Sequence, residues 1–344
     1  MRMQVRGWKP NHGAPRMLVV AMLVMTTGAC GGGAETAPPA EHPDALLPDS
    51  PPRSVPKASD LVKQGEQKLQ QDDPAGAQGL FERAIAEQPD DPRAHLDLGI
   101  ALELQGDADG AEGSYRRAIE LAPDLTEALN NLAVLLRLRG ELDESVALLQ
   151  RAIASDNRSA AAYTNLGLAQ EDRGEMREAE RAYRQALSLD DSALMTRVNL
   201  GLLLVRLGDV DGAREQLRKA LPGAQGNRAA LLAIGNGLRR AGDSAGAVQA
   251  MQAAVDADDE PTPALLSELA LAQRADGDRE AAIATLQAVL KSNPGYATAH
   301  YLLGNMLAGA GRFAQARKHY QRYLKLAPDG PHVARARERL GKLP

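Results

Sequence analysis

Small, apolar and polar positions recur along this chain every thirty-four residues. A small residue, Gly or Ala, stands at this spacing at Gly65, Gly99, Ala133, Gly167, Gly201 and Gly235, and after one extra residue again at Ala270 and Gly304. A second Gly follows seven places later at Gly106, Gly140, Gly174, Gly208, Gly242, Gly277 and Gly311. A constant period of this length indicates an array of stacked units, not a single globular core.

Each unit contains the pattern of two helices. Counting the first residue of a unit as position 1, positions 4, 7, 8 and 11 form one apolar helical stripe, as in Leu129, Leu132, Ala133 and Leu136. We expect that stripe to pack against Ala at position 20 of a second helix, because small residues let two helix backbones approach closely. The Gly at position 15 predicts a left-handed turn that ends the first helix. The acid after it favours the positive N-terminus of the second helix.

These positions resemble the tetratricopeptide repeat (TPR) family. The resemblance implies an all-α fold, a right-handed superhelical α-solenoid of about eight helix-turn-helix repeats with a C-terminal capping helix. The predicted organisation is a signal peptide over 1–29, a lipidated Cys and Pro-rich tether over 30–57, a TPR array over 58–330, and a capping helix and tail over 331–344. The repeats lie near 58–91, 92–125, 126–159, 160–193, 194–227, 228–262, 263–296 and 297–330.

Composition narrows the kind of core and the kind of partner. Apolar residues make up 44% of the chain and aromatic residues only 3%, so the core must consist mainly of Leu and Ala. The formal net charge of −5 gives nonspecific nucleic-acid binding little electrostatic support, and we expect no nucleic-acid partner. A single cysteine excludes both an intramolecular disulfide framework and a zinc site built from cysteines.

The N-terminal residues have the pattern of an export signal. Residues 1–30 contain no acid, and four cations precede the nine-residue apolar run Met17–Met25, which is too short to span a bilayer. The following Thr27-Gly28-Ala29-Cys30 resembles a bacterial lipoprotein signal. The resemblance implies lipidation of Cys30 and anchoring in the outer membrane facing the periplasm. An ordinary secreted protein with a free thiol is the alternative.

The segments on either side of the array each allow two interpretations. Residues 31–57 contain seven prolines. They are either a semi-extended spacer or a leader with no spacing role. Residues 331–342 have the pattern of a short helix with Val333, Ala336 and Leu340 on one side and basic residues on the other. This helix is predicted to be a solubilising cap, with a basic docking surface as the alternative.

Motifs for catalysis and metal binding are missing from the sequence. It contains no H-E-x-x-H, no phosphate-binding G-x-x-x-x-G-K and no nucleophile elbow. Six histidines are present, and none is expected to form a metal-binding pair, because even His300 and His319 fall on different predicted helices. We therefore expect a protein that is not an enzyme, with no cofactor and no metal.

The candidate site is the face of the first helix opposite its core stripe, at positions 2, 6, 9 and 13. Position 6 gives Asn131, Asn165 and Asn199, and an Asn side chain can pair with both the N–H and the C=O of an extended peptide. Aliphatic residues recur at position 9, where solvent is expected, and predict an exposed apolar patch. The predicted peptide-binding groove consists of Ile100, Asn131, Val134, Arg137, Asn165, Leu168, Asn199, Leu202, Arg206, Asn236 and Arg240.

Two alternatives to this groove remain open. The asparagines belong to the common Asn-Leu-Gly form of the repeat, although their succession resembles the asparagine ladder with which some repeat proteins hold a peptide backbone. The arginines either pair with acids of a partner or neutralise the neighbouring Glu171 and Asp172.

The sequence predicts a non-enzymatic, lipid-anchored scaffold that binds protein or peptide partners in the bacterial envelope. The family resemblance extends to TPR lipoproteins that act as pilotins, which help a secretin assemble during pilus or secretion-system biogenesis. The alternatives are a scaffold for exopolysaccharide export and the regulatory arm of an envelope enzyme.

Overall fold

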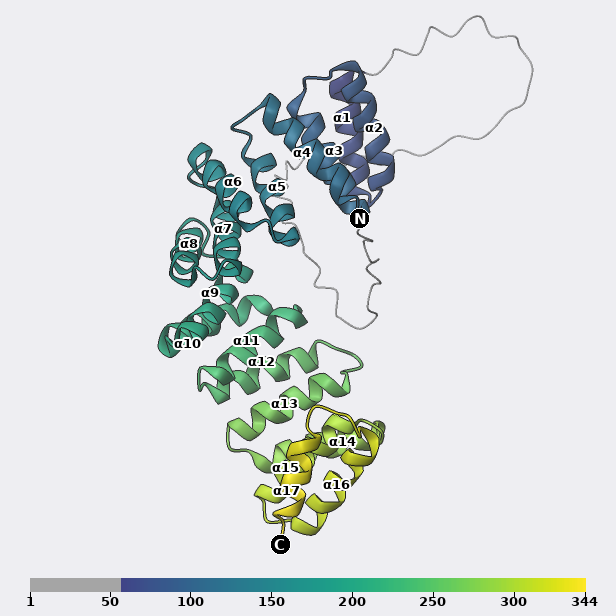
Figure 1. The fold of residues 1–344 in the computed structure, drawn as a ribbon, viewed down its shortest axis with the longest axis vertical. Coiled ribbons are helices and arrows are strands. Elements are labelled where there is room, and N and C mark those ends of the chain that lie inside the picture. The colour runs from purple at the N-terminus through teal and green to yellow at the C-terminus, as the bar shows by residue number, and fades with distance from the viewer. Residues whose placement is uncertain (1–56) are drawn as a thin grey trace, which may run out of the picture. The chain divides into compact units, whose positions relative to one another are not determined.

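The computed structural model describes residues 57–344. The predicted signal peptide, Cys30 and nearly all of the tether lie outside these residues. The described part consists of seventeen α-helices and one short 3-10 helix, with no strand between residues 57 and 344. Figure 1 shows how the helices follow one another. The helices are α1 (Ala58–Gln70), α2 (Pro74–Glu87), α3 (Pro92–Gln105), α4 (Ala108–Leu121), α5 (Thr126–Arg139), α6 (Leu142–Ser155), α7 (Ala160–Asp172), α8 (Met176–Leu189), α9 (Leu194–Leu207), α10 (Val210–Ala220), η1 (Pro222–Ala224), α11 (Arg228–Arg240), α12 (Ser244–Asp256), α13 (Pro263–Ala275), α14 (Arg279–Ser292), α15 (Ala297–Gly309), α16 (Phe313–Leu326) and α17 (Val333–Gly341).

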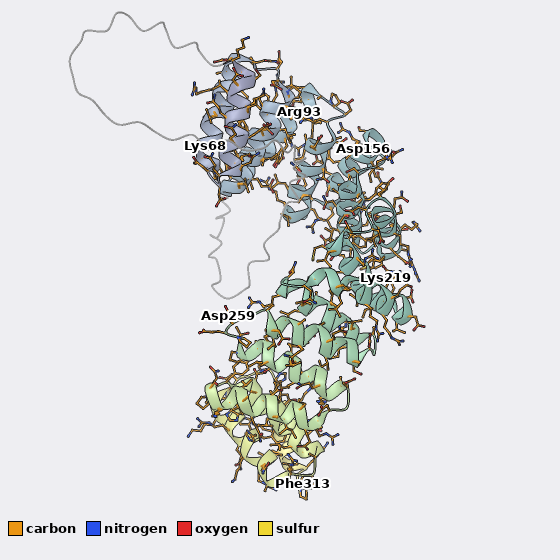
Figure 2. The ribbon with its side chains drawn as sticks, turned by 180° about the vertical axis from the view of Figure 1, so that it is seen from behind. Lys68, Arg93, Asp156, Lys219, Asp259 and Phe313 are labelled. Carbon is orange, nitrogen blue, oxygen red and sulfur yellow. The ribbon has the colours of Figure 1, made fainter. Side chains whose placement is uncertain are left out.

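Consecutive helices form hairpins, and each hairpin packs against the next one along the chain (Figures 1 and 2). We call the odd-numbered helices α1 to α15 the A helices and the even-numbered helices α2 to α16 the B helices. Each A helix begins at position 1 of its repeat, as the period predicts. The remaining helix, α17, packs against α16. The predicted fold class is confirmed, and among residues 57–344 no helix is long and apolar enough to cross a membrane.

Glycine at position 15 ends the A helix as predicted. Gly106 has φ +83° and Gly140 has φ +84°, in the left-handed region that an L side chain rarely adopts. The Asp107 amide N–H donates to the Leu102 carbonyl oxygen and the Gly106 N–H to that of Glu103, so the carbonyls at the helix end are satisfied. In the first repeat Asp72 takes the same position with φ +59°. The turn is therefore conserved in geometry where the residue differs.

The small residue at position 8 contacts a different neighbour from the one expected. A Cβ added to Gly99 would lie 2.4 Å from Cε1 of Tyr115, and one added to Gly167 would lie 2.5 Å from Cε1 of Tyr183. Both rings come from position 24 of the B helix, whereas the sequence analysis paired position 8 with the Ala at position 20. Ala111 and the other Ala residues at position 20 are buried, but the ring fills the space beside the glycine.

Candidate peptide-binding surface

The predicted binding residues lie together on the A helices. Asn131, Asn165 and Asn199 occupy matching places on α5, α7 and α9, one per repeat, and each is half-buried. We call the residues at positions 6, 9 and 13 of α3, α5, α7, α9 and α11 the A-helix face. It contains every predicted groove residue except Arg137, which lies at position 12 of α5.

The aliphatic row at position 9 is less exposed than the sequence analysis expects. Ile100, Val134, Leu168 and Leu202 are all half-buried. Three of them pack against the buried core, Ile100 against the cluster around Leu132, Leu168 against the cluster around Tyr183, and Leu202 against the cluster around Leu217. Packing against these core clusters therefore accounts for part of this row.

The large exposed apolar side chains of the face lie one turn further along. Leu104 on α3 is 61% exposed and Leu138 on α5 is 54% exposed. Each lies four residues after a position-9 aliphatic, so Ile100 with Leu104 and Val134 with Leu138 share one side of their helices. The sequence pattern does not distinguish these two leucines from their neighbours, although it places position 13 on the solvent side.

The asparagines use their hydrogen-bonding groups unequally. The Asn165 side-chain amide donates to Oδ1 of Asn130 over 2.8 Å, and Asn130 in turn donates to Oδ1 of Asn131 over 3.4 Å. Asn199 has no side-chain hydrogen bond to any residue between 57 and 344. The three amides are thus only partly satisfied within the array, and Asn130 is a link between repeats that the sequence analysis did not identify.

Two of the predicted arginines are neutralised within the array. Nη1 of Arg137 lies 2.7 Å from Oδ2 of Asp172, and Arg206 forms an ion pair with Glu171. Glu171 also accepts a hydrogen bond of 3.0 Å from the Tyr183 hydroxyl. For these two residues the structure supports the intramolecular alternative.

At the far end of the face, Arg240 on α11 is exposed and has no ion pair within residues 57–344. Its neighbour Asn236 accepts a hydrogen bond of 3.2 Å from Arg239. The positive charge at this end of the face is therefore carried by Arg240.

An acidic side chain marks the opposite end of the same surface. Asp97, at position 6 of α3, is half-buried, and its pKa is raised to about 7. Burial is the main cause, and the nearby Glu66 raises the pKa further, while Arg93 partly opposes both effects. Asp97 therefore titrates near neutral pH, and the sequence alone gave no indication of it.

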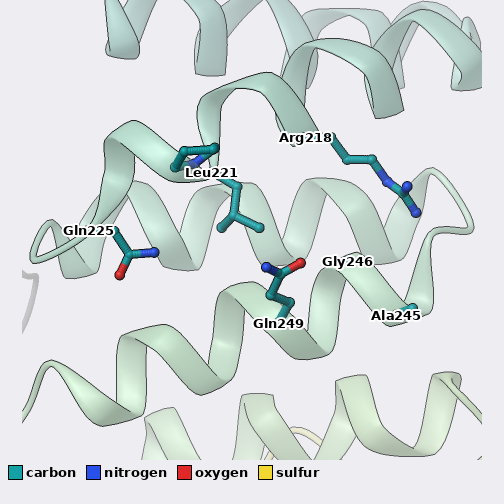
Figure 3. A pocket seen from close by; sticks show the side chains of 7 residues that line it. Arg218, Leu221, Gln225, Ala245, Gly246 and Gln249 are labelled. Carbon is teal, nitrogen blue, oxygen red and sulfur yellow. The ribbon is translucent and has the colours of Figure 1, made fainter.

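A pocket of about 450 Å³ lies elsewhere, between α10, η1 and the start of α12 (Figure 3). Arg218, Leu221, Gln225 and Gln249 line it. The Arg218 guanidinium is bound to Asp243, with Nη2 2.7 Å from Oδ1, so the one charged side chain of the lining is already neutralised. The pocket has no residue in common with the A-helix face.

His300 and His319 lie on different helices, as predicted, but their side chains are in contact, which the sequence did not indicate. Their Nδ1 atoms lie 2.9 Å apart across the α15–α16 hairpin. Nε2 of His300 lies 3.1 Å from the Pro294 carbonyl oxygen, as Nε2 of His95 lies 2.9 Å from that of Pro89. The recurrence of this contact at position 4 indicates a structural role between repeats. Within the described residues no three His, Cys, Asp or Glu side chains are placed to hold a metal ion.

The comparisons with known proteins identify the family. Models of the tetratricopeptide repeat match residues 62–126, 124–192, 164–230, 198–260 and 267–331. The chain belongs to the tetratricopeptide repeat family. A search of curated proteins found no match. The TPR fold is that of a scaffold or peptide-binding adaptor, as the sequence predicts.

Solved structures share this fold at low sequence identity. The chain is similar to a TPR protein from Parabacteroides merdae, with 16% identity over 73% of this chain and 98% of the other and a TM-score of 0.51. It is also similar to pilF of Pseudomonas aeruginosa, with 19% identity over 57% of this chain and 89% of the other and a TM-score of 0.52. A third likeness is to PilW, described as a widely conserved type IV pilus biogenesis factor, with 20% identity over 57% and 90% and a TM-score of 0.52.

Proposed function

We propose that this protein is a non-enzymatic adaptor that holds an extended segment of a protein partner along its A-helix face. The observation that carries the proposal is the alignment of partly satisfied amides with exposed leucines on successive A helices. Asn131, Asn165 and Asn199 recur once per repeat, and Leu104 and Leu138 extend from the same surface. An amide side chain both donates and accepts, so a row of them matches the alternating N–H and C=O groups of an extended backbone.

The polarity of the A-helix face changes along the array, and this change indicates the composition of the partner segment. Positions 9 and 13 are Ile100 and Leu104 in repeat two and Val134 and Leu138 in repeat three, whereas repeat six has Asn236 and Arg240. Apolar side chains of a partner would bury Leu104 and Leu138, which gains roughly 25 cal/mol for each Å² removed from water. A carboxylate of the partner would then face Arg240. The segment therefore combines apolar residues at one end with an acid at the other.

The finer proposal places this adaptor in the bacterial envelope, in the assembly of a type IV pilus or a secretion system. The lipoprotein-like Thr27-Gly28-Ala29-Cys30 supports export and anchoring through Cys30. The fold shared with pilF and PilW supports a role in pilus assembly only at the level of architecture. Cys30→Ser tests the anchor, because loss of lipidation is expected to move the protein from the membrane to the soluble fraction. Unchanged fractionation would rule out a lipid anchor at Cys30.

The binding proposal is tested by replacing the three amides together. Asn131→Ala, Asn165→Ala and Asn199→Ala in one chain are expected to reduce partner capture in crosslinking and mass spectrometry of the native envelope. The matched control replaces Asn157 and Asn293, which are exposed residues of loops between repeats. A second variant, Leu104→Ser with Leu138→Ser, removes the exposed apolar side chains without disturbing buried ones. Wild-type capture by both folded variants would refute the proposal.

A further inference from the structure

The C-terminal end of the array carries a concentration of positive charge that the peptide-binding proposal does not use. Residues 313–344 contain eight Lys or Arg and two Asp or Glu, although the whole chain has a net charge of −5. We propose that this end docks on the acidic first two repeats of a second copy of the same chain. The basic residues of the docking surface are Lys318, Arg322 and Lys325 of α16 with Arg335 and Arg337 of α17, which we call the C-terminal basic surface.

Every side chain of the C-terminal basic surface is exposed and without an ion pair in the described part of the chain. Lys318, Arg322 and Lys325 follow one another at spacings of four and three, so they share one side of α16. The three other cations of residues 313–344 have partners: Lys342 pairs with Glu338, Arg339 donates to Asn305 over 2.9 Å, and Arg317 donates to the Pro344 carbonyl oxygen over 2.7 Å. The five unpaired cations are thus a distinct set.

In the B helix of the fourth repeat, by comparison, the basic side chains form ion pairs with acids of the same helix. On α8, Arg177 and Arg184 lie 3.0 Å from Glu180, and Arg181 lies 2.9 Å from Glu178. The sequence of α16, by contrast, contains no acid between Phe313 and Leu326, so no pairing within that helix is available. A cap that only needs solubility has no reason to exclude acids in this way, because a mixture of both signs serves solubility equally.

The first two repeats carry the opposite charge. Residues 58–121, from α1 to α4, contain fourteen Asp or Glu and six Lys or Arg. Glu66 is exposed, and neither it nor Asp97 has an ion pair within residues 57–344. Burial is the main cause of the raised pKa of Asp97, and the negative charge of Glu66 adds to it. A set of fixed cations supplied by another molecule would neutralise this excess.

The two surfaces lie at opposite ends of the chain, so the contact is heterologous: the basic end of one copy meets the acidic end of the next. Such a contact leaves a free basic end and a free acidic end on every dimer, and association therefore continues with concentration. Because the attraction is between exposed charges, salt weakens it strongly, with a screening length of about 8 Å at physiological ionic strength. The inference does not rest on the asparagines, although Asp97 at the acidic end also belongs to the A-helix face.

Sedimentation velocity of the purified full chain tests this inference over a range of protein and salt concentrations. Wild type is expected to form larger species at low salt and to dissociate as salt is added. Lys318→Glu, Arg322→Glu and Lys325→Glu in one chain are expected to weaken self-association about tenfold or more. The matched control places the same three charge reversals on α8, as Arg177→Glu, Arg181→Glu and Arg184→Glu, and is expected to associate like wild type.

A charge swap decides between a specific contact and a general effect of net charge. The α16 triple variant combined with Glu66→Lys, which adds a cation at the acidic end, is expected to regain part of the lost association. A monomeric wild type at low salt would overturn the inference, as would equal loss in the α8 and α16 variants. Binding of the monomeric wild type to vesicles of anionic phospholipid, lost in the α16 variant, would also overturn it and assign the surface to lipid.

Discussion

Gly99→Ala tests whether the Tyr115 ring of α4 leaves room only for glycine at position 99 of α3. The added Cβ would lie 2.4 Å from Cε1 and 2.6 Å from Cδ1 of Tyr115. That ring is fully buried and its hydroxyl donates to Oε2 of Glu103 over 2.7 Å, so it has little freedom to move aside. Overpacking of this kind costs about 2 kcal/mol. Ala stabilises a helix by about 1 kcal/mol relative to Gly, so Gly99→Ala should lower the free energy of unfolding by about 1 kcal/mol in total.

The effect of Gly99→Ala on the free energy of unfolding should change sign when the ring of Tyr115 is removed. In repeat three the matching positions hold Ala133 and Leu149, both buried, which shows that Ala is accommodated opposite Leu. In a Tyr115→Leu background, Gly99→Ala is therefore expected to stabilise the chain by about 1 kcal/mol. The coupling between the two sites is then about 2 kcal/mol.

Urea unfolding of the four chains, followed by circular dichroism, measures this coupling, and hydrogen exchange in α3 and α4 localises it. Long repeat arrays need not unfold in one step, so the local measurement is the more direct of the two. Gly113→Ala is the control, because nothing lies within 4 Å of its added Cβ and only the helix gain remains. Equal destabilisation by Gly99→Ala in both backgrounds would refute the packing argument.

Three further predictions concern titration and turn geometry. Because its folded pKa is raised, Asp97 lowers stability as the pH rises from about 4 to above 7, so Asp97→Asn should stabilise the chain by about 1–2 kcal/mol more at pH 8 than at pH 5 in urea unfolding. Burial lowers the pKa of His300 and His319, so the unfolded chain binds protons more readily than the folded one, and the protection factors of amides in α15 and α16 should fall as the pH falls below about 6.5; protection factors that do not change with pH would contradict this. Gly106→Ala places a side chain at φ +83° and should cost about 1 kcal/mol in the same unfolding assay, whereas no loss would show that the turn relaxes.

The repeat period predicted the fold because each of its positions depends on local geometry. Gly106 is needed for a left-handed turn, and Pro92 begins α3 as a proline at the first helical position can. The neighbour of Gly99 was not predicted, because it depends on which rotamer of Tyr115 fills the space between two helices. The meeting of His300 with His319 likewise depends on the register of a hairpin, which a spacing of nineteen residues does not reveal.

The binding surface was predictable in position but not in detail. Counting along the helix located Asn199 and Leu202 on the side away from the core stripe. It could not show that Arg137 is bound to Asp172 of the next repeat, because that ion pair depends on how repeats stack. Nor could it rank Leu138 above Val134 as the exposed apolar residue, since both lie on the same side of α5.

Photocrosslinking from single positions in the native envelope tests the central claim most directly. A photoreactive amino acid at Asn199 or at Leu138 is expected to capture the same partner, and mass spectrometry should map both crosslinks to one extended segment. The same probe at Ala147, an exposed position of the B helix α6, is expected to leave that segment uncaptured. Capture of the partner from Ala147 and not from Asn199 or Leu138 would contradict binding along the A-helix face.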